Sequence, residues 1–266
     1  MSIITLTTDF GLADGYVGTM KGVILGIDPT ATIVDISHDI APQDVREAAY
    51  TLYTAYPYFP QGTIHVVVVD PGVGSERRAI ALRMPQATFV APDNGALSYV
   101  VAGERVEEIV HLTNPRHHLS PVSHTFHGRD IFAPAAAHLA RGIRLAELGE
   151  PLTDIVTFPL PRPQVRPDGV VVGQVIHVDR FGNLTTSIMP KDWTDRLLRE
   201  GIIEIKGQSI RGIANNYAEG TPGKLQALIG SSNHLEIAVS GGSAAQSLEA
   251  EVGDEVLLKV EGHEDG

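Results

Sequence analysis

The sequence predicts an α/β protein with two domains: an N-terminal, mostly parallel α/β sandwich domain over residues 1–160 and a smaller C-terminal β-barrel-like domain over residues 170–266. Apolar, strand-like runs alternate with helix-like segments in the first domain, an order typical of parallel sheets covered by helices. Four prolines between residues 159 and 167 then indicate a stiff linker, which we place at 161–169. Beyond it, short strand-like runs are separated by glycine turns, as in small barrels.

Each element of the first domain has its own signal. Ile3–Thr8 is β-branched and apolar, and Gly15–Gly26 carries apolar residues at helical spacing. Asp44 is suited to cap a helix that continues to Ala55. Thr63–Val69 is continuously apolar, as in a strand buried on both faces. The remaining expected elements are strands at Thr32–Ile36, Ala79–Arg83, Thr88–Ala91 and Val106–Val110 and a helix at about Ile131–Arg141.

The second domain is predicted from short strands with one helix among them. The helix is expected at Met189–Arg199. The expected strands are Val170–Val178, Ile202–Ile205, Leu225–Ile229, Leu235–Val239 and Glu255–Val260.

Composition excludes several functional classes. The 266 residues carry a formal net charge of -12, so we expect no nucleic-acid partner, because an acidic surface repels phosphates. The chain has no cysteine, which excludes disulfides, thiolate metal sites and cysteine nucleophiles. Met1–Thr8 lacks the basic and apolar regions of a signal peptide, and no apolar run approaches membrane-spanning length. We therefore expect a cytoplasmic protein without a membrane partner.

Two aspartates directly follow predicted strands. Asp9 stands after Ile3–Thr8, and Asp70 begins the segment Asp-Pro-Gly-Val-Gly-Ser-Glu-Arg-Arg after Thr63–Val69. Ligands of parallel sheets bind at the carboxyl ends of strands, so Asp9 could accept hydrogen bonds from a ribose, or else stabilise its own turn. Arg77 could fold back onto Asp70 and keep it ionised, or else be a solvated arginine.

A polar cluster precedes the last helix of the first domain. His124, His127 and Asp130 could form a metal site, or His127 could be a single polarising histidine in a cleft. A third alternative makes Asp130 a helix N-cap. Gly128 argues against a helix at this point, which weakens the metal interpretation. A second metal interpretation, with Asp35, His38 and Asp39, competes with a simple turn.

The second domain offers groups suited to a purine and to a carboxylate. Asn183 could read a purine edge with its amide, while Phe181 and Tyr217 offer aromatic faces for stacking. The run Gly230–Asn233 suits a carboxylate and equally suits a hairpin turn.

Taken in order, the motifs TTDFG, VDPGVG, APDNG, FHGRDIFAPAAAHLA, DRFGN and IGSSNHLEIAV resemble the S-adenosyl-L-methionine hydroxide adenosyltransferase family, relatives of fluorinating and chlorinating enzymes. The resemblance covers nearly the whole chain. It implies hydrolysis of S-adenosyl-L-methionine to adenosine and methionine, no cofactor or metal, and a homotrimer. It also implies an active site between the N-terminal domain of one subunit and the C-terminal domain of the next.

The resemblance also implies roles for individual residues. The family's catalytic residues fall on Asp70, Arg77 and His127. Its substrate-binding residues fall on Asp9, Asp70, Asp179, Asn183, Tyr217 and Ser231, with Asp9 at the ribose, Asn183 at the adenine and Ser231 near the methionine end. Either Asp70 or His127 could take the proton from water.

Departures from the halogenating relatives favour water as the nucleophile. Those relatives have tyrosine where this chain has Asp70, and the fluorinating type has serine at Gly128 and a long insertion between Arg83 and Thr88. A carboxylate repels a halide ion. The alternatives that stay open are a halogenase-like enzyme, a metal-dependent hydrolase and a nucleoside-binding protein without turnover.

Overall fold

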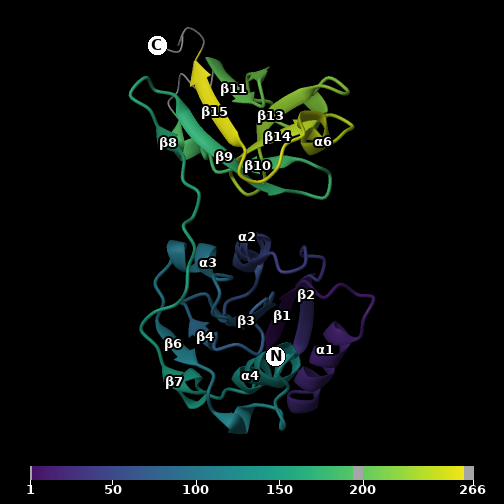
Figure 1. The fold of residues 1–266 in the computed structure, drawn as a ribbon, viewed down its shortest axis with the longest axis vertical. Coiled ribbons are helices and arrows are strands. Elements are labelled where there is room, and N and C mark those ends of the chain that lie inside the picture. Colours follow the sequence, from purple (N-terminus) through teal and green to yellow (C-terminus); the bar gives the residue numbers. More distant parts are fainter. Residues whose placement is uncertain (1, 194–199, 261–266) are drawn as a thin grey trace. The chain divides into compact units, whose positions relative to one another are not determined.

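The computed structural model describes residues 2–193 and 200–260 and divides into two compact units, residues 1–159 and 160–266 (Figure 1). The short strand β8 (Gln164–Val165) pairs with β9 (Val171–Val178). Part of the stretch expected to be a linker is therefore a strand of the second unit.

The first unit contains a seven-stranded mixed sheet in the order β2-β1-β3-β5-β4-β6-β7. The pairs β2–β1, β1–β3 and β3–β5 are parallel, whereas β5–β4, β4–β6 and β6–β7 are antiparallel. The expectation of a mostly parallel sheet is thus corrected. Only Met84–Gln86 separate β4 from β5, and a parallel crossover needs a dozen or more residues. The strands are β1 (Ile3–Thr8), β2 (Thr32–Ser37), β3 (Thr63–Val68), β4 (Ala79–Arg83), β5 (Ala87–Pro92), β6 (Glu108–His111) and β7 (Glu150–Pro151).

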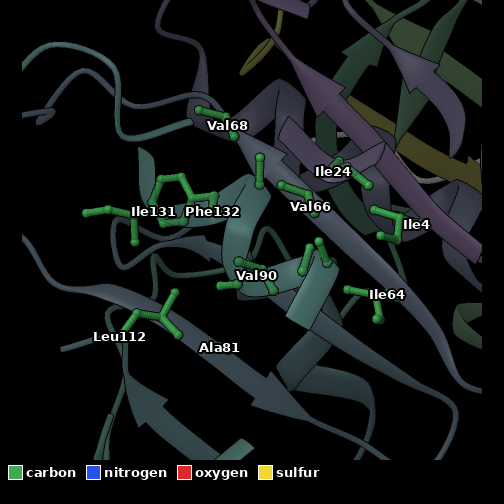
Figure 2. Packing of buried hydrophobic residues seen from close by; sticks show 14 of the residues in the cluster. Ile4, Ile24, Ile64, Val66, Val68, Ala81, Val90, Leu112, Ile131 and Phe132 are labelled. Atoms are coloured by element: carbon green, nitrogen blue, oxygen red, sulfur yellow. The ribbon is translucent and has the colours of Figure 1, made fainter. Parts of the chain in front are cut away.

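Helices cover both faces of this sheet. On one face, α1 (Tyr16–Ile27) and α4 (Ala133–Ala140) pack with residues such as Val66 and Val68, which Figure 2 shows beside Phe132. The other face is covered by α2 (Val45–Ala55) and α3 (Ser98–Gly103). Each large apolar side chain buried here contributes about 1.5–3 kcal/mol. Apolar residues of β1 and β3 belong to the first core, and β3 also contributes Val67 to the second. Asp9 and Asp70 follow the carboxyl ends of these two strands.

The predicted cap of α2 is confirmed, because the Asp44 carboxylate accepts a hydrogen bond from the backbone N–H of Glu47 at 2.9 Å. Short 3₁₀ turns lie at Tyr56–Tyr58, Pro115–His117, Leu145–Glu147, Pro190–Asp192 and Tyr217–Glu219.

The second unit is an antiparallel sheet that nearly closes into a barrel. The path runs β12-β11-β15-β9-β10-β14-β13, and a bridge between Ala214 and Leu228 links the segment after β12 to β13. The barrel-like expectation agrees with this sheet. Its further elements are β10 (Leu184–Thr186), β11 (Gly201–Ile205), β12 (Gln208–Arg211), β13 (Leu225–Ile229), β14 (Leu235–Val239), α6 (Ala244–Leu248) and β15 (Glu255–Val260).

The helix expected at Met189–Arg199 is described only in part. Pro190–Asp192 forms a single 3₁₀ turn, and residues 194–199 lie outside the described part of the chain. Of the helices in the described ranges, none has both the length and the apolar character needed to cross a bilayer.

Candidate active site

The carboxyl ends of β1 and β3 border a cavity of about 390 Å³ in the first unit. Because the two strands are parallel neighbours, Asp9 and Asp70 reach this cavity from the same edge of the sheet. His127 enters it from the segment before α4. The wall is completed by three aromatic rings that contact one another edge-on or tilted, those of Phe10, Tyr16 and Phe126.

Arg77 joins Asp70 to His127. Its Nε donates a hydrogen bond to Oδ1 of Asp70 at 2.8 Å, and its Nη2 contacts the second carboxylate oxygen. The same Nη2 lies 2.8 Å from Nδ1 of His127. The side chains of Arg77 and Asp70 are only 9% and 5% exposed, so water screens this pair little. The solvated-arginine alternative for Arg77 is thereby excluded.

The bond from Arg77 to His127 has a fixed direction. A guanidinium only donates, so Nδ1 of His127 must be the acceptor and carries no proton. The proton of the neutral ring is then on Nε2. Burial, followed by the positive charge of Arg77, lowers the pKa of His127, which favours the same neutral form. His127 can therefore donate a hydrogen bond from Nε2.

Two glycines let the loop after β3 fold over Asp70. A Cβ at Gly72 would lie 3.1 Å from Cγ of Arg77, so glycine leaves space for the arginine to fold back. Gly74 has a φ of +78°, and a Cβ there would lie 2.3 Å from the carbonyl oxygen of His124. The loop thus packs backbone against backbone on the segment that carries His127.

His127 directly precedes a helical turn that the sequence did not predict. Gly128–Phe132 forms a π-helical turn that continues into α4, so the expectation that Gly128 prevents a helix here is wrong. A side chain at Gly128 would crowd Met20, Phe126 and Val68 at 3.2–3.3 Å, which accounts for the glycine. Single π turns occur often at functional sites, where they redirect a side chain.

Asp130 is not a helix cap, and its hydrogen-bond partners are residues that do not border the cavity. Its carboxylate accepts hydrogen bonds from Nε of Arg129 at 2.6 Å and from the backbone N–H of Ser123 at 2.7 Å. It therefore ties the Ser123 segment to the π turn. Within the described ranges, no three His, Cys, Asp or Glu side chains are arranged to hold a metal ion, so neither His124/His127/Asp130 nor Asp35/His38/Asp39 forms such a group.

The turn that carries Asp9, residues Thr8–Gly11, is called the Asp9 turn below. Its internal side-chain bond runs from the N–H of Phe10 to Oγ1 of Thr8, at 3.2 Å. The Asp9 side chain does not stabilise its own turn in this way; its Oδ2 instead accepts a hydrogen bond from the backbone N–H of Gln43 at 2.8 Å. The Asp9 carboxylate keeps lone pairs for a ligand, which favours the binding alternative over the turn alternative.

A second cavity, of about 590 Å³, lies in the second unit and is bordered by Asp179, Phe181, Asn183 and Tyr217. Asp179 accepts hydrogen bonds from the backbone N–H groups of Phe181 and Asn183 and, at 2.9 Å, from the Asn183 amide. The buried Asn183 keeps its amide oxygen and one N–H for a ligand. The Phe181 ring is 77% exposed and Tyr217 is 48% exposed.

Ser231 is not among the residues that border this cavity. It is exposed on the turn between β13 and β14. Glu236, which sequence reasoning missed, is only 8% exposed and accepts a hydrogen bond from the Tyr217 hydroxyl at 2.5 Å. Burial, and the nearby charge of Asp179, raise the pKa of Glu236. The available signal was a charged residue within the otherwise apolar strand Leu235–Val239.

Sequence reasoning also missed the aromatic wall of the first cavity. Phe10 and Phe126 lie inside two of the motifs, directly beside Asp9 and His127, so their positions were the available signal. Tyr16 is the first residue of α1 and lies in none of the motifs, so no sequence feature marked it as part of the wall.

Comparisons with known proteins agree with the two-unit structure. Models of the N-terminal and C-terminal domains of SAM hydroxide adenosyltransferase match residues 4–149 and 173–257. An (R)-S-adenosyl-L-methionine hydrolase from Salinispora tropica is 39% identical, over 96% of this chain and 97% of its own. A fluorinase from an Actinoplanes species is 33% identical over 71% of this chain and 72% of its own.

The crystal structure of an uncharacterised conserved protein from Thermotoga maritima superposes with a TM-score of 0.89 at 38% identity, covering 96% of this chain and 99% of that one. The resemblance noted in the sequence is thus confirmed by family models that together span most of the chain. The chain belongs to the SAM hydroxide adenosyltransferase family.

Proposed function

We propose that this protein hydrolyses S-adenosyl-L-methionine to adenosine and L-methionine, with water attacking the ribose 5′ carbon. One observation carries the proposal: Arg77 holds Asp70 and His127 together beside a cavity that also contains Asp9. Four relatives named (R)-S-adenosyl-L-methionine hydrolase, 36–40% identical over nearly the whole chain, support it.

In this proposal the substrate is bound by side chains of the first unit of one subunit and of the second unit of another. Asp9 accepts hydrogen bonds from the two ribose hydroxyls, and Asn183 pairs with the adenine edge through its free amide oxygen and N–H. Asp179 holds Asn183 in place, Tyr217 contacts the bound nucleoside, and Ser231 lies near the methionine end. The geometry supports Ser231 least, because Ser231 does not border the second cavity.

Asp70 and His127 hold the attacking water. Nε2–H of His127 donates to the water oxygen, and a water hydrogen points to the Asp70 carboxylate. Nδ1 of His127 is occupied by Arg77 and its Nε2 is protonated, so Asp70 takes the proton. Positioning of this kind supplies roughly 7–11 kcal/mol of barrier reduction.

The bond changes need no further reactant. The water oxygen forms a bond to the 5′ carbon while the bond from that carbon to sulfur breaks, and its electron pair stays on sulfur. The sulfonium becomes a neutral thioether, so no general acid is required. Water has a pKa of about 15.7, too high for a carboxylate to deprotonate it in advance, so proton transfer to Asp70 accompanies the C–O bond formation. This route uses no metal ion and no cofactor.

Water rather than a halide is the nucleophile in this proposal. Asp70 borders the cavity as a buried carboxylate, and it would repel an anion approaching the 5′ carbon. Fluoride and chloride should therefore not compete with water.

We also propose a homotrimer in which the first unit of one subunit and the second unit of the next bind one substrate. The expected ligand set is divided between the two units, and each cavity carries exposed aromatic rings, Tyr16 in one and Phe181 and Tyr217 in the other. Exposed aromatic groups around a polar site are typical of surfaces that a partner covers.

Product analysis tests the reaction. Purified protein is incubated with S-adenosyl-L-methionine and chelator, with and without chloride or fluoride, and the nucleosides are separated by chromatography. Adenosine and methionine in equal amounts under all conditions are expected. A halogenated nucleoside, or no turnover, would overturn the proposal.

Co-expression tests the shared site. Asp70→Ala disables the first unit and Asn183→Ala the second. If sites combine units from neighbouring subunits, each mixed trimer regains one intact site of three, which is about a quarter of all sites when equal amounts of the two variants assemble at random. Mixtures as inactive as the separate variants would contradict a shared site.

A further inference from the structure

A continuous series of polar contacts lies behind the Asp9 turn. Lys21 Nζ is 2.6 Å from Oδ2 of Asp35, and the other oxygen of Asp35 is 3.0 Å from Nε2 of His38. Nδ1 of His38 is 2.8 Å from Oγ1 of Thr8, the first residue of the turn. His38 and Thr8 are buried, at 5% and 0% exposure, whereas the Asp35 side chain is 38% exposed. The series therefore runs from the surface to the Asp9 turn.

The direction of each contact follows from the groups involved. Thr8 Oγ1 accepts from the N–H of Phe10, and its own proton needs an acceptor because the hydroxyl is buried. Nδ1 of His38 is the acceptor within reach in the described part of the chain. The His38 proton then lies on Nε2, which is 3.0 Å from the Asp35 carboxylate that Lys21 also contacts. The geometry of this last contact is not that of a hydrogen bond, so its attraction is electrostatic. With these assignments, each contact in the series joins a donor to an acceptor.

The segment that carries His38 holds the Asp9 turn at two further points. The N–H of Gly11 donates to the carbonyl of His38 at 2.8 Å, and Oδ2 of Asp9 accepts from the N–H of Gln43. The strand before it is irregular: Leu6 pairs with Asp35, but Thr7 pairs with Ser37, so β2 carries one extra residue. Such a bulge bends the strand end, here next to the residues that reach the Asp9 turn.

We propose that His38 is a positioning residue for substrate binding. Held between Thr8 and Asp35, it fixes the Asp9 turn so that the Asp9 carboxylate is already oriented for the ribose hydroxyls. The inference rests on the proposed role of Asp9. Its physical basis is that a turn fixed before binding loses less conformational freedom when the ligand binds.

The chain provides a matched control for the test. Thr5, on the same strand as Thr8, forms an equivalent buried hydrogen bond with Nδ1 of His65, at 2.7 Å, away from the Asp9 turn. Thr8→Val and Thr5→Val each remove one buried threonine–histidine bond and keep the β-branched shape. Thr8→Val also removes the bond that Oγ1 of Thr8 accepts from the N–H of Phe10, so the role of His38 requires that Asp35→Asn, which leaves that bond intact, weakens binding as well.

The measurements are adenosine affinity by calorimetry and KM and kcat with S-adenosyl-L-methionine. We expect Thr8→Val to weaken adenosine binding and raise KM about tenfold, with kcat little changed. Thr5→Val should keep wild-type affinity and KM. Asp35→Asn, at the exposed end of the series, leaves the core intact and should raise KM about threefold. It also provides the test if Thr8→Val fails to fold. Wild-type affinity in Asp35→Asn, or in a folded Thr8→Val, overturns the proposal.

Asp9→Asn separates this inference from the proposed function. If Asp9→Asn weakens adenosine binding and Thr8→Val does not, only the positioning role of His38 is wrong. If Asp9→Asn binds adenosine as the wild type does, the ribose role of Asp9 is wrong, and the positioning role falls with it.

Discussion

Nη2 of Arg77 lies 2.8 Å from Nδ1 of His127, and the same nitrogen contacts the Asp70 carboxylate. Because a guanidinium has no acceptor, this bond forms only when Nδ1 of His127 is unprotonated. The relationship fixes both the tautomer and the charge of His127. In the proposed mechanism, this tautomer leaves Asp70 as the acceptor of the water proton, a choice that the sequence left open between Asp70 and His127.

Turnover should decline at acid pH as His127 is protonated. Burial and Arg77 lower the pKa of His127 below its ordinary 6.5, so the neutral form persists to below that pH. Protonation of Nδ1 then removes the acceptor for Arg77. We expect kcat/KM to be constant from about pH 7 to 8 and to fall about tenfold per pH unit below the pKa of His127.

The same explanation is tested by His127→Asn. Asparagine keeps an oxygen near the position of Nδ1 but lacks the Nε2–H, so we expect kcat to fall about 100-fold and the acid limb to disappear. An unchanged acid limb in the variant would assign that limb to another group.

Arg77→Lys should be nearly as damaging as Arg77→Ala. A lysine amine cannot reach both oxygens of Asp70 and Nδ1 of His127 in one planar arrangement, so we expect kcat to fall about 100-fold. Arg78→Lys is the matched control, because Arg78 pairs with Asp93 and Asp154 and touches neither Asp70 nor His127. Steady-state kinetics of both variants, with their melting temperatures, separates loss of catalysis from loss of stability. Equal kcat in the two variants would contradict the bridging role.

Gly74→Ala should disturb both the fold and the reaction. The added Cβ would meet the carbonyl oxygen of His124 at 2.3 Å, and the backbone has a φ of +78°. We expect a loss of about 1–3 kcal/mol of stability, measured by urea unfolding, and lower kcat because the loop after Asp70 shifts. Gly62→Ala, with a φ of +85° and open space around its Cβ, should cost about 1 kcal/mol and keep full kcat.

Tyr217 and Glu236 should behave as a coupled pair. Burial, together with the bond to Glu236, raises the pKa of Tyr217, which keeps its hydroxyl protonated as the donor. Glu236→Ala and Tyr217→Phe each remove this bond and should weaken adenosine binding about fivefold, with little added loss in the double variant. Glu236→Gln keeps an acceptor and should bind within about twofold of wild type. A fully additive double variant would mean that the two residues act independently.

The strands and helices with strong periodicity could be predicted from the sequence. β1, β4, β13, β14 and β15 have the predicted bounds, because each is a short run in which apolar or β-branched residues predominate. The three-residue strand β10 and the four-residue strand β12 are too short to show a period. The sheet was expected to be mostly parallel because the first three strands alternate with helices. The connection Met84–Gln86 between β4 and β5 is too short for a parallel crossover, so it indicated that these two strands are antiparallel.

The charged residues Asp70, Arg77 and His127 of the candidate site could be predicted, but neither their geometry nor the aromatic wall beside them could. Asp70 and Arg77 are seven residues apart in one loop, so their pairing could be anticipated. His127 is fifty residues further along, and only the fold brings its Nδ1 to Arg77. The π turn after His127 could not be predicted, because Gly128 within it lies beside Met20, Phe126 and Val68 only in the folded chain.

The most direct test of the central claim follows the oxygen atom of water. Protein and S-adenosyl-L-methionine are incubated in water enriched in the heavy oxygen isotope, with chelator present, and the adenosine formed is examined by mass spectrometry. Our account predicts one heavy oxygen at the 5′ position of adenosine in the wild type, and no such product above background in Asp70→Ala. Adenosine that carries only the light isotope would show that the 5′ oxygen does not come from water and would contradict the account.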